Sequence, residues 1–95
     1  MSNESDQSGV TLYGTGLCPF CMRARALLEQ KGVAFTDIDV SDSADRRAMT
    51  DKAGGDHRVP QIFIGSLHVG GCDELMALER DGELDRLLGG EQPNA

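Results

Sequence analysis

The sequence predicts one α/β domain, in which a mixed four-stranded sheet carries helices. A short β-branched segment, Val10 to Tyr13, precedes a helical pattern and then a second strand pattern. Such a strand–helix–strand start implies two parallel strands joined by a right-handed crossover. Two later apolar segments flank Gly65 and Ser66, as in a hairpin. The predicted order is therefore β-α-β-α-β-β-α.

The first helix is predicted from Pro19 to Lys31, because apolar residues recur there at helical spacing and Gly32 can end it. The next segment alternates in polarity, which is typical of a half-buried strand. Three of its residues are predicted to face the core: Thr36, Ile38 and Val40.

A second helix is predicted to start at a serine cap, Ser41 or Ser43, and to end near Ala53. The hairpin follows, over residues 61–64 and 67–70. A third helix is predicted from Cys72, with Gly82 as its stop and one or two helical turns over 83–88 behind it. Its inner stripe is predicted to comprise Cys72, Leu75, Met76 and Leu78.

Length and charge limit the function classes. The chain has 95 residues, enough for one small domain, and a net charge of −7. This acidity disfavours nucleic acid and anionic membranes as partners. No apolar run approaches the roughly 18 residues of a membrane span.

Both ends of the chain are polar. Residues 1–9 lack the basic and apolar segments of a signal peptide, and we predict a disordered leader there. We predict the folded domain over 10–89 and a disordered tail over 90–95. The expected location is the cytoplasm, and the expected state is a monomer.

Two cysteines with two residues between them, Cys18 and Cys21, raise three possibilities. A zinc site would need four ligands, which Cys72 and either His57 or His68 could complete. His68 and Cys72 are four residues apart, so this alternative stays open, although such a site normally shows a second pair with its own short spacing. A static disulfide would close too short a loop to stabilise the fold much. The third possibility is a redox couple.

Placement favours the redox couple. The pair lies where a strand ends and a helix begins, and Pro19 suits the first helical position. Cys18 then caps the helix, where the free N–H groups of Phe20 and Cys21 and the helix dipole favour its thiolate. Cys21 lies on the same face and should be more buried and less acidic. We therefore predict Cys18 as the nucleophile and Cys21 as the resolving cysteine or a bystander.

Two further segments carry weaker signals. Pro60 should open a strand, which leaves the backbone of Val59 available to a substrate. Gly70 and Gly71 allow close backbone approach, and the helix that follows can offer free N–H groups to a carboxylate ligand. The acidic residues of its first turn are also explained by dipole compensation alone.

Together, "YGTGLCPFC", "VPQIFIG" and "HVGGCDEL" resemble the glutaredoxin family, most closely the short bacterial dithiol type. The resemblance covers about Thr11 to Leu88. It implies a thioredoxin-like fold with helices on both faces of the sheet, and a glutathione-dependent reductase of glutathione-mixed and protein disulfides. Glutathione is then a co-substrate, with no permanently bound cofactor or metal. Implied partners are disulfide-containing or glutathionylated proteins, for instance ribonucleotide reductase.

The resemblance also implies residue roles. Cys18 and Cys21 would be the catalytic pair, and Pro60 a cis-proline. Val59 would pair its backbone with the cysteinyl part of glutathione, and Arg46 (or Arg47) would lie near the glycyl carboxylate. The other implied contacts are Gly71, Cys72 and Asp73 at the γ-glutamyl end, the aromatic wall Phe20, and Thr15.

The chain departs from the family pattern at three positions. Thr15 replaces the usual lysine, Arg58 the usual threonine and Phe20 the usual tyrosine, so Arg58 is a candidate to supply the missing cation. Two rival functions remain open at this point. One is a redoxin reduced directly by thioredoxin reductase, and the other is an iron–sulfur carrier in which Cys18 and glutathione bridge two subunits.

Overall fold

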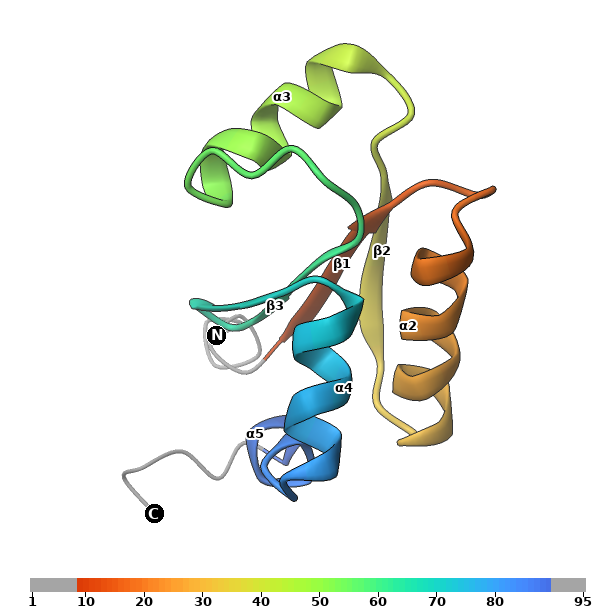
Figure 1. Ribbon diagram of the computed structural model, residues 1–95, viewed down its shortest axis with the longest axis vertical. Helices are drawn as coiled ribbons and strands as arrows, with labels where there is room; N and C mark the ends of the chain where they lie inside the picture. The colour runs from red at the N-terminus through yellow and green to blue at the C-terminus, as the bar shows by residue number, and fades with distance from the viewer. Residues whose placement is uncertain (1–8, 90–95) are drawn as a thin grey trace.

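The computed structural model describes residues 9–89. The predicted disordered ends, apart from Gly9, lie outside the described residues. The elements follow in the predicted order (Figure 1): β1 (Val10–Gly14), α2 (Pro19–Gln30), β2 (Phe35–Asp39), α3 (Ser43–Lys52), β3 (Gln61–Ile64), β4 (Leu67–Gly70), α4 (Cys72–Arg80) and α5 (Leu84–Leu88).

The four strands form one mixed sheet in the order β2-β1-β3-β4. Strands β1 and β2 are parallel, whereas β3 pairs antiparallel with both β1 and β4. The carboxyl ends of β1, β2 and β4 therefore meet the amino end of β3 at one edge of the sheet. The predicted four-stranded mixed sheet is confirmed, and three of the loops at that edge are those that precede α2, β3 and α4.

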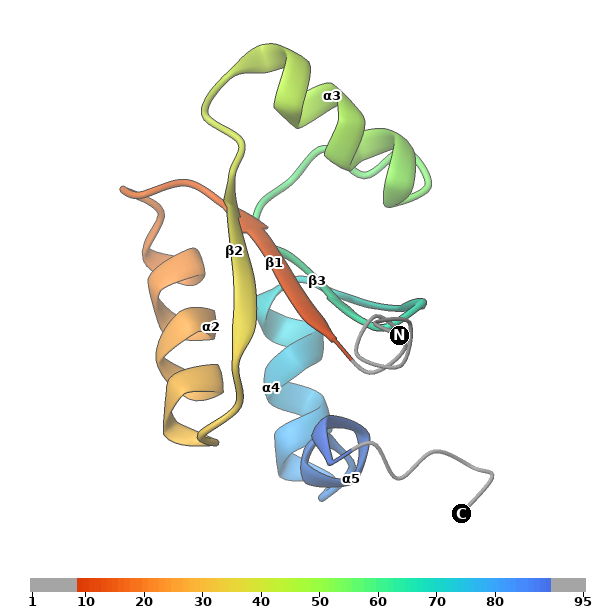
Figure 2. The same cartoon turned by 180° about the vertical axis from the view of Figure 1, so that it is seen from behind.

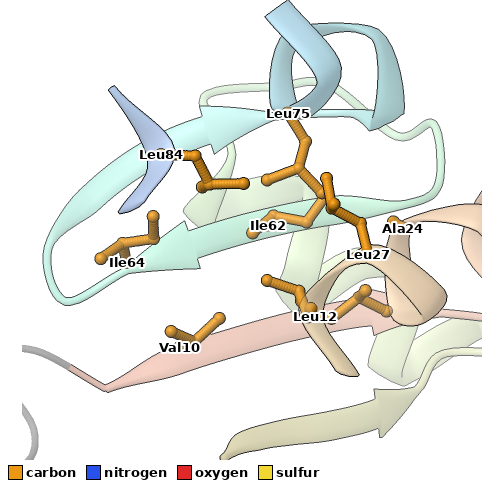
Figure 3. Close-up of a cluster of buried hydrophobic side chains, with 9 residues drawn as sticks. Val10, Leu12, Ala24, Leu27, Ile62, Ile64, Leu75 and Leu84 are labelled. Atoms are coloured by element: carbon orange, nitrogen blue, oxygen red, sulfur yellow. The ribbon is translucent and has the colours of Figure 1, made fainter. Parts of the chain in front are cut away.

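The hydrophobic core lies between the sheet and the helices α2, α4 and α5 (Figure 3). Strands β1 and β3 contribute alternate residues, as a sheet with one covered face requires. Figure 3 shows these side chains converging from both layers: Val10, Leu12, Ile62 and Ile64 from the strands and Ala24, Leu27, Leu75 and Leu84 from the helices.

The opposite face of the sheet carries α3. Phe63 alternates with the core residues of β3 and packs edge-on against Tyr13. Lys52, at the end of α3, lies 5.1 Å from the centre of the Phe63 ring. Figures 1 and 2 show α3 set apart from α2 and α4, which lie beside each other. Helices on both faces are thus confirmed.

Two local predictions are wrong. Helix α3 is capped by Asp42, whose Oδ2 accepts from the Ala44 N–H at 3.0 Å, and not by a serine. Ser41 instead donates its hydroxyl to Asp39. In β2, Thr36 is exposed, and Phe35 packs against the core. The strand is at the edge of the sheet, where its own polarity pattern says little about which residue a helix will cover.

Candidate active site

The site forms at the edge of the sheet where the three loops converge. Cys18 lies between the end of β1 and the start of α2, and Pro60 immediately precedes β3. The start of α4 follows directly on β4. This topology brings two segments that are far apart in the chain, Cys18 to Cys21 and Val59 to Asp73, to the same edge.

Cys18 is the N-cap of α2. Its backbone is extended, Pro19 occupies the first helical turn, and the Cys21 N–H donates to Cys18 Sγ at 3.2 Å. The first turn of α2 contains no acidic side chain. When Cys18 is ionised, its sulfur therefore carries the negative charge at this helix start. The backbone N–H of Cys21 stabilises that charge.

The two thiols differ in their acidity. Partial burial alone would raise the pKa of Cys18, but hydrogen bonds from the Cys21 thiol and from the Cys21 and Phe20 amides, together with the Arg25 charge, lower it. Burial, aided by the hydrogen bond and charge of Cys18, raises the pKa of Cys21 to about 11. The half-buried Cys18 is thus the more acidic of the two thiols, and the buried Cys21 the less acidic.

Cys21 sits directly against the end of β1. A Cβ built on Gly14 would lie 2.8 Å from Cys21 Sγ and 3.2 Å from its Cβ, closer than atoms can pack. Gly14 is buried and its backbone pairs with β2, so it has no room to move away. Because Gly14 has no side chain, the Cys21 thiol can pack directly against the end of β1.

A groove of about 630 Å³ runs from α2 across the sheet edge to α4 and α3. Phe20, two residues after Cys18, forms its wall at α2. All predicted binding residues except Thr15 line it: Phe20, Arg46, Val59, Pro60, Gly71, Cys72 and Asp73. Thr15 lies outside the groove, and its carbonyl oxygen accepts a hydrogen bond from Arg25.

The segment before β3 is held on both sides. The Val59–Pro60 peptide bond is cis, as the family resemblance predicts. Buried Gln61 donates its Nε2 to the Arg58 carbonyl at 2.9 Å, and its Oε1 accepts from His68 Nε2 at 2.6 Å. A Cβ on Gly71 would come within 3.3 Å of the Pro60 carbonyl oxygen, so the starts of β3 and α4 touch through backbone.

One of the free amides at the start of α4 is already bound by a side chain of the same helix. Glu74 Oε1 accepts the Gly71 N–H at 2.8 Å, which makes one half of a capping box. Gly70 has φ of 115°, a left-handed conformation that favours glycine. The amides of Cys72 and Asp73, in the first helical turn, have no acceptor within the helix, and both residues line the groove. Burial raises the pKa of the Cys72 thiol.

The cations of the groove come from α3 and the loop behind it. Arg46 donates its Nε to the His57 carbonyl at 2.9 Å, which fixes its side chain along the groove. Arg58 makes two 3.0 Å bonds to the Asp56 carboxylate, which hold the pKa of that carboxyl well below its usual range. The predicted compensating cation is therefore already paired with Asp56, although it still lines the groove.

Arg25 is a residue of the site that the sequence pattern did not predict. It lies seven residues after Cys18, two turns along α2, and its guanidinium contacts Asp37 and the Thr15 carbonyl. The i, i+7 spacing from Cys18 was the available signal. Within residues 9–89, no three His, Cys, Asp or Glu side chains lie close enough to hold a metal ion together.

Comparison with known proteins identifies the family. Residues 10–69 match the glutaredoxin family. The chain is 51% identical over 79 residues to a glutaredoxin of Pseudomonas aeruginosa, covering 83% of this chain and 94% of that protein. It is 46% identical over 81 residues to glutaredoxin 3 of Escherichia coli, covering 85% and 98%. The chain belongs to the glutaredoxin family.

Solved glutaredoxin structures share the fold. The solution structure of a glutaredoxin from Brucella melitensis superposes with a TM-score of 0.77 at 46% identity, covering 92% of this chain and 95% of that one. A crystal structure of a buckwheat glutaredoxin–glutathione complex gives 0.78 at 28% identity, with 93% and 86% covered. Glutaredoxins are glutathione-dependent thiol oxidoreductases, and this chain is one by membership. Over residues 9–89 there is no helix of the length and apolarity that crossing a bilayer requires.

Proposed function

We propose that Cys18 carries the glutathionyl group in the glutaredoxin reaction of this protein and that Cys21 acts only on protein disulfides. The observation that supports this most strongly is the N-cap position of Cys18, whose sulfur accepts the Cys21 N–H at 3.2 Å. A thiolate stabilised in this way is both a good nucleophile and a good leaving group near neutral pH.

The exchange with a glutathione-mixed disulfide takes two steps. Cys18 Sγ⁻ attacks the sulfur of the glutathionyl group, a Cys18–glutathione disulfide forms, and the substrate leaves as a thiolate that takes up a proton. A second glutathione thiolate then attacks the glutathione sulfur of this disulfide. Oxidised glutathione leaves, and the Cys18 thiolate is restored with its hydrogen bonds in place.

A protein disulfide uses both cysteines. Cys18 forms a mixed disulfide with the protein, after which Cys21 loses its proton and attacks Cys18 Sγ, releasing the second protein thiolate. Since burial raises the pKa of Cys21 to about 11, this second attack requires Cys21 to give up its proton first. Exchange with a glutathione-mixed disulfide needs only Cys18 and is therefore independent of that step. Proposed protein substrates are glutathionylated or disulfide-containing cytoplasmic proteins, with ribonucleotide reductase as one candidate, acted on by a monomer.

The groove is proposed to hold the glutathionyl group by complementary charges. The backbone of Val59 would pair with the cysteinyl residue, and the amides of Cys72 and Asp73 would bind the γ-glutamyl carboxylate. The Asp73 carboxylate would face the ammonium group. Arg46, held by the His57 carbonyl, would contact the glycyl carboxylate, and Phe20 would cover the apolar side.

Two serine variants test the division of roles. A mixed disulfide of glutathione and cysteine serves as substrate, and glutathione reductase reports the oxidised glutathione produced. Cys18→Ser should reduce turnover to the uncatalysed rate, whereas Cys21→Ser should retain turnover of the mixed disulfide and lose that of a protein disulfide. The reverse pattern would overturn the assignment. Replacing glutathione with thioredoxin reductase alone as the electron donor should give no turnover.

A further inference from the structure

Arg25 lies on the same face of α2 as the two cysteines. Cys18, Cys21 and Arg25 are spaced three and four residues apart, so they form one stripe along the helix. Cys18 is at the helix start, Cys21 is one turn in, and Arg25 is one turn further. The side chain of Arg25 is only 20% exposed, although it carries a charge.

Two partners from separate elements hold the guanidinium. Arg25 Nε donates to Asp37 Oδ2 at 2.7 Å, and Arg25 Nη2 donates to the Thr15 carbonyl at 3.3 Å. Asp37 belongs to β2, and Thr15 begins the loop that runs from β1 to Cys18. The planar fork of the guanidinium therefore links the outer strand to the loop that presents the nucleophile.

The other cation near the start of α2 has a different environment. The guanidinium carbon of Arg23 lies 5.8 Å from the centre of the Phe20 ring. The Arg25 charge acts on both thiols: it lowers the pKa of Cys18 and opposes the rise at Cys21, where burial is the largest cause. Thr15, whose side chain carries no charge, contributes only its carbonyl oxygen, so the charge beside the cysteines comes from the helix.

We propose that Arg25 is a positioning residue for the exchange reaction: held by Asp37 and the Thr15 carbonyl, its guanidinium stabilises the thiolate of Cys18 from two turns along the helix. Arg25 is not among the residues that line the groove. Its effect reaches the reaction through the ionisation of Cys18 and the placement of the loop before it. The inference rests on the proposed role of Cys18 as nucleophile.

The test measures the pH dependence of Cys18 alkylation by iodoacetamide, resolved by residue with mass spectrometry. In Arg25→Gln the midpoint should rise by about half a pH unit to one unit, because a partly exposed opposite charge is removed. Arg25→Lys should restore most of that shift. Arg23→Gln removes the same charge from the same helix and should leave the midpoint unchanged.

Arg25→Met supplies a second neutral variant of similar length if the Gln variant unfolds in the alkaline part of the profile. An unchanged midpoint in both neutral variants, or an equal rise in Arg23→Gln, would overturn the inference. Alkylation does not depend on glutathione. A failure of the proposed function would therefore appear separately, as turnover that survives Cys18→Ser, while the midpoint still responds to Arg25.

Discussion

Two helices begin at the same edge of the sheet and use their free amides in different ways. The start of α2 contains no acidic side chain and gives its Cys21 amide to the Cys18 sulfur. The start of α4 carries Asp73 and Glu74, and Glu74 takes the Gly71 amide. At the start of α2 the positive end of the helix dipole therefore acts on a thiolate. At the start of α4 the carboxylates of Asp73 and Glu74 offset part of the helix dipole.

The difference separates reactivity from recognition. At α2 the uncompensated helix start lowers the pKa of one thiol, and that thiol reacts. At α4 the remaining amides and the Asp73 carboxylate together suit a zwitterionic group, with both a carboxylate and an ammonium. A substitution at the first site should therefore alter thiol chemistry, and one at the second should alter substrate affinity.

The largest effect is expected where α2 meets β1. Gly14→Ala should destabilise the protein by about 1–3 kcal/mol, because the added Cβ would lie 2.8 Å from Cys21 Sγ in a buried position. Urea unfolding measures this loss. Gly16→Ala is the matched control, since nothing lies within 4 Å of a Cβ there. Equal stability of the Gly14 and Gly16 variants would show that Cys21 can move aside freely.

The second prediction concerns how the free energy of unfolding changes at alkaline pH. Burial raises the pKa of Cys21 from its ordinary 9.0 to about 11, so between these pH values the folded state holds a proton that the unfolded chain releases. Stability should fall across this interval, by up to about 2 kcal/mol from this group. Unfolding of Cys21→Ala, measured over the same interval, should show a smaller fall. Parallel curves for the two proteins would contradict the raised pKa.

The third prediction concerns α4. Glu74→Ala removes the acceptor of the Gly71 N–H and should cost about 1 kcal/mol of stability. The KM for a glutathione-mixed disulfide should rise several-fold, while the pH dependence of Cys18 alkylation stays unchanged. Glu74→Gln keeps an acceptor oxygen and should retain most of the stability. A shift of the Cys18 profile in Glu74→Ala would mean that the two helix starts are coupled.

The smallest effect is expected from a variant that places an acidic residue near the start of α2, as the start of α4 already has. Met22 is 57% exposed near the first turn, so Met22→Glu should fold normally. The added charge should raise the pKa of Cys18 by a few tenths of a unit, since such charges at helix ends contribute about 0.3–1 kcal/mol. Met22→Gln, with no charge, should not. The measurement is the rate of Cys18 alkylation at a pH below the midpoint, in the unaltered protein, Met22→Glu and Met22→Gln. A faster rate in Met22→Glu would contradict the electrostatic account.

The sequence predicted the parts of the site that rest on local rules. Pro19 at the first helical position indicated Cys18 as the cap, and the structure confirms this placement. Pro60 marked the start of β3, and the glycines before Cys72 marked the start of α4. Family resemblance added the cis bond at Pro60, which local rules leave open.

The sequence did not predict features that depend on which elements meet in space. The role of Arg25 does not follow from the helix alone, because its partners Asp37 and Thr15 belong to other elements. The need for glycine at position 14 arises from Cys21, seven residues later. The inward position of Phe35 likewise depends on the packing of helices over an edge strand. Each of these needed the tertiary structure.

The most direct test of the central claim is the ultraviolet thiolate absorbance of Cys18 as a function of pH. In a Cys21→Ser/Cys72→Ser variant Cys18 is the only thiol, and the serine hydroxyl at position 21 can still donate to its sulfur. The account predicts a midpoint clearly below the ordinary value of 9.0. A midpoint at or above that value would contradict it.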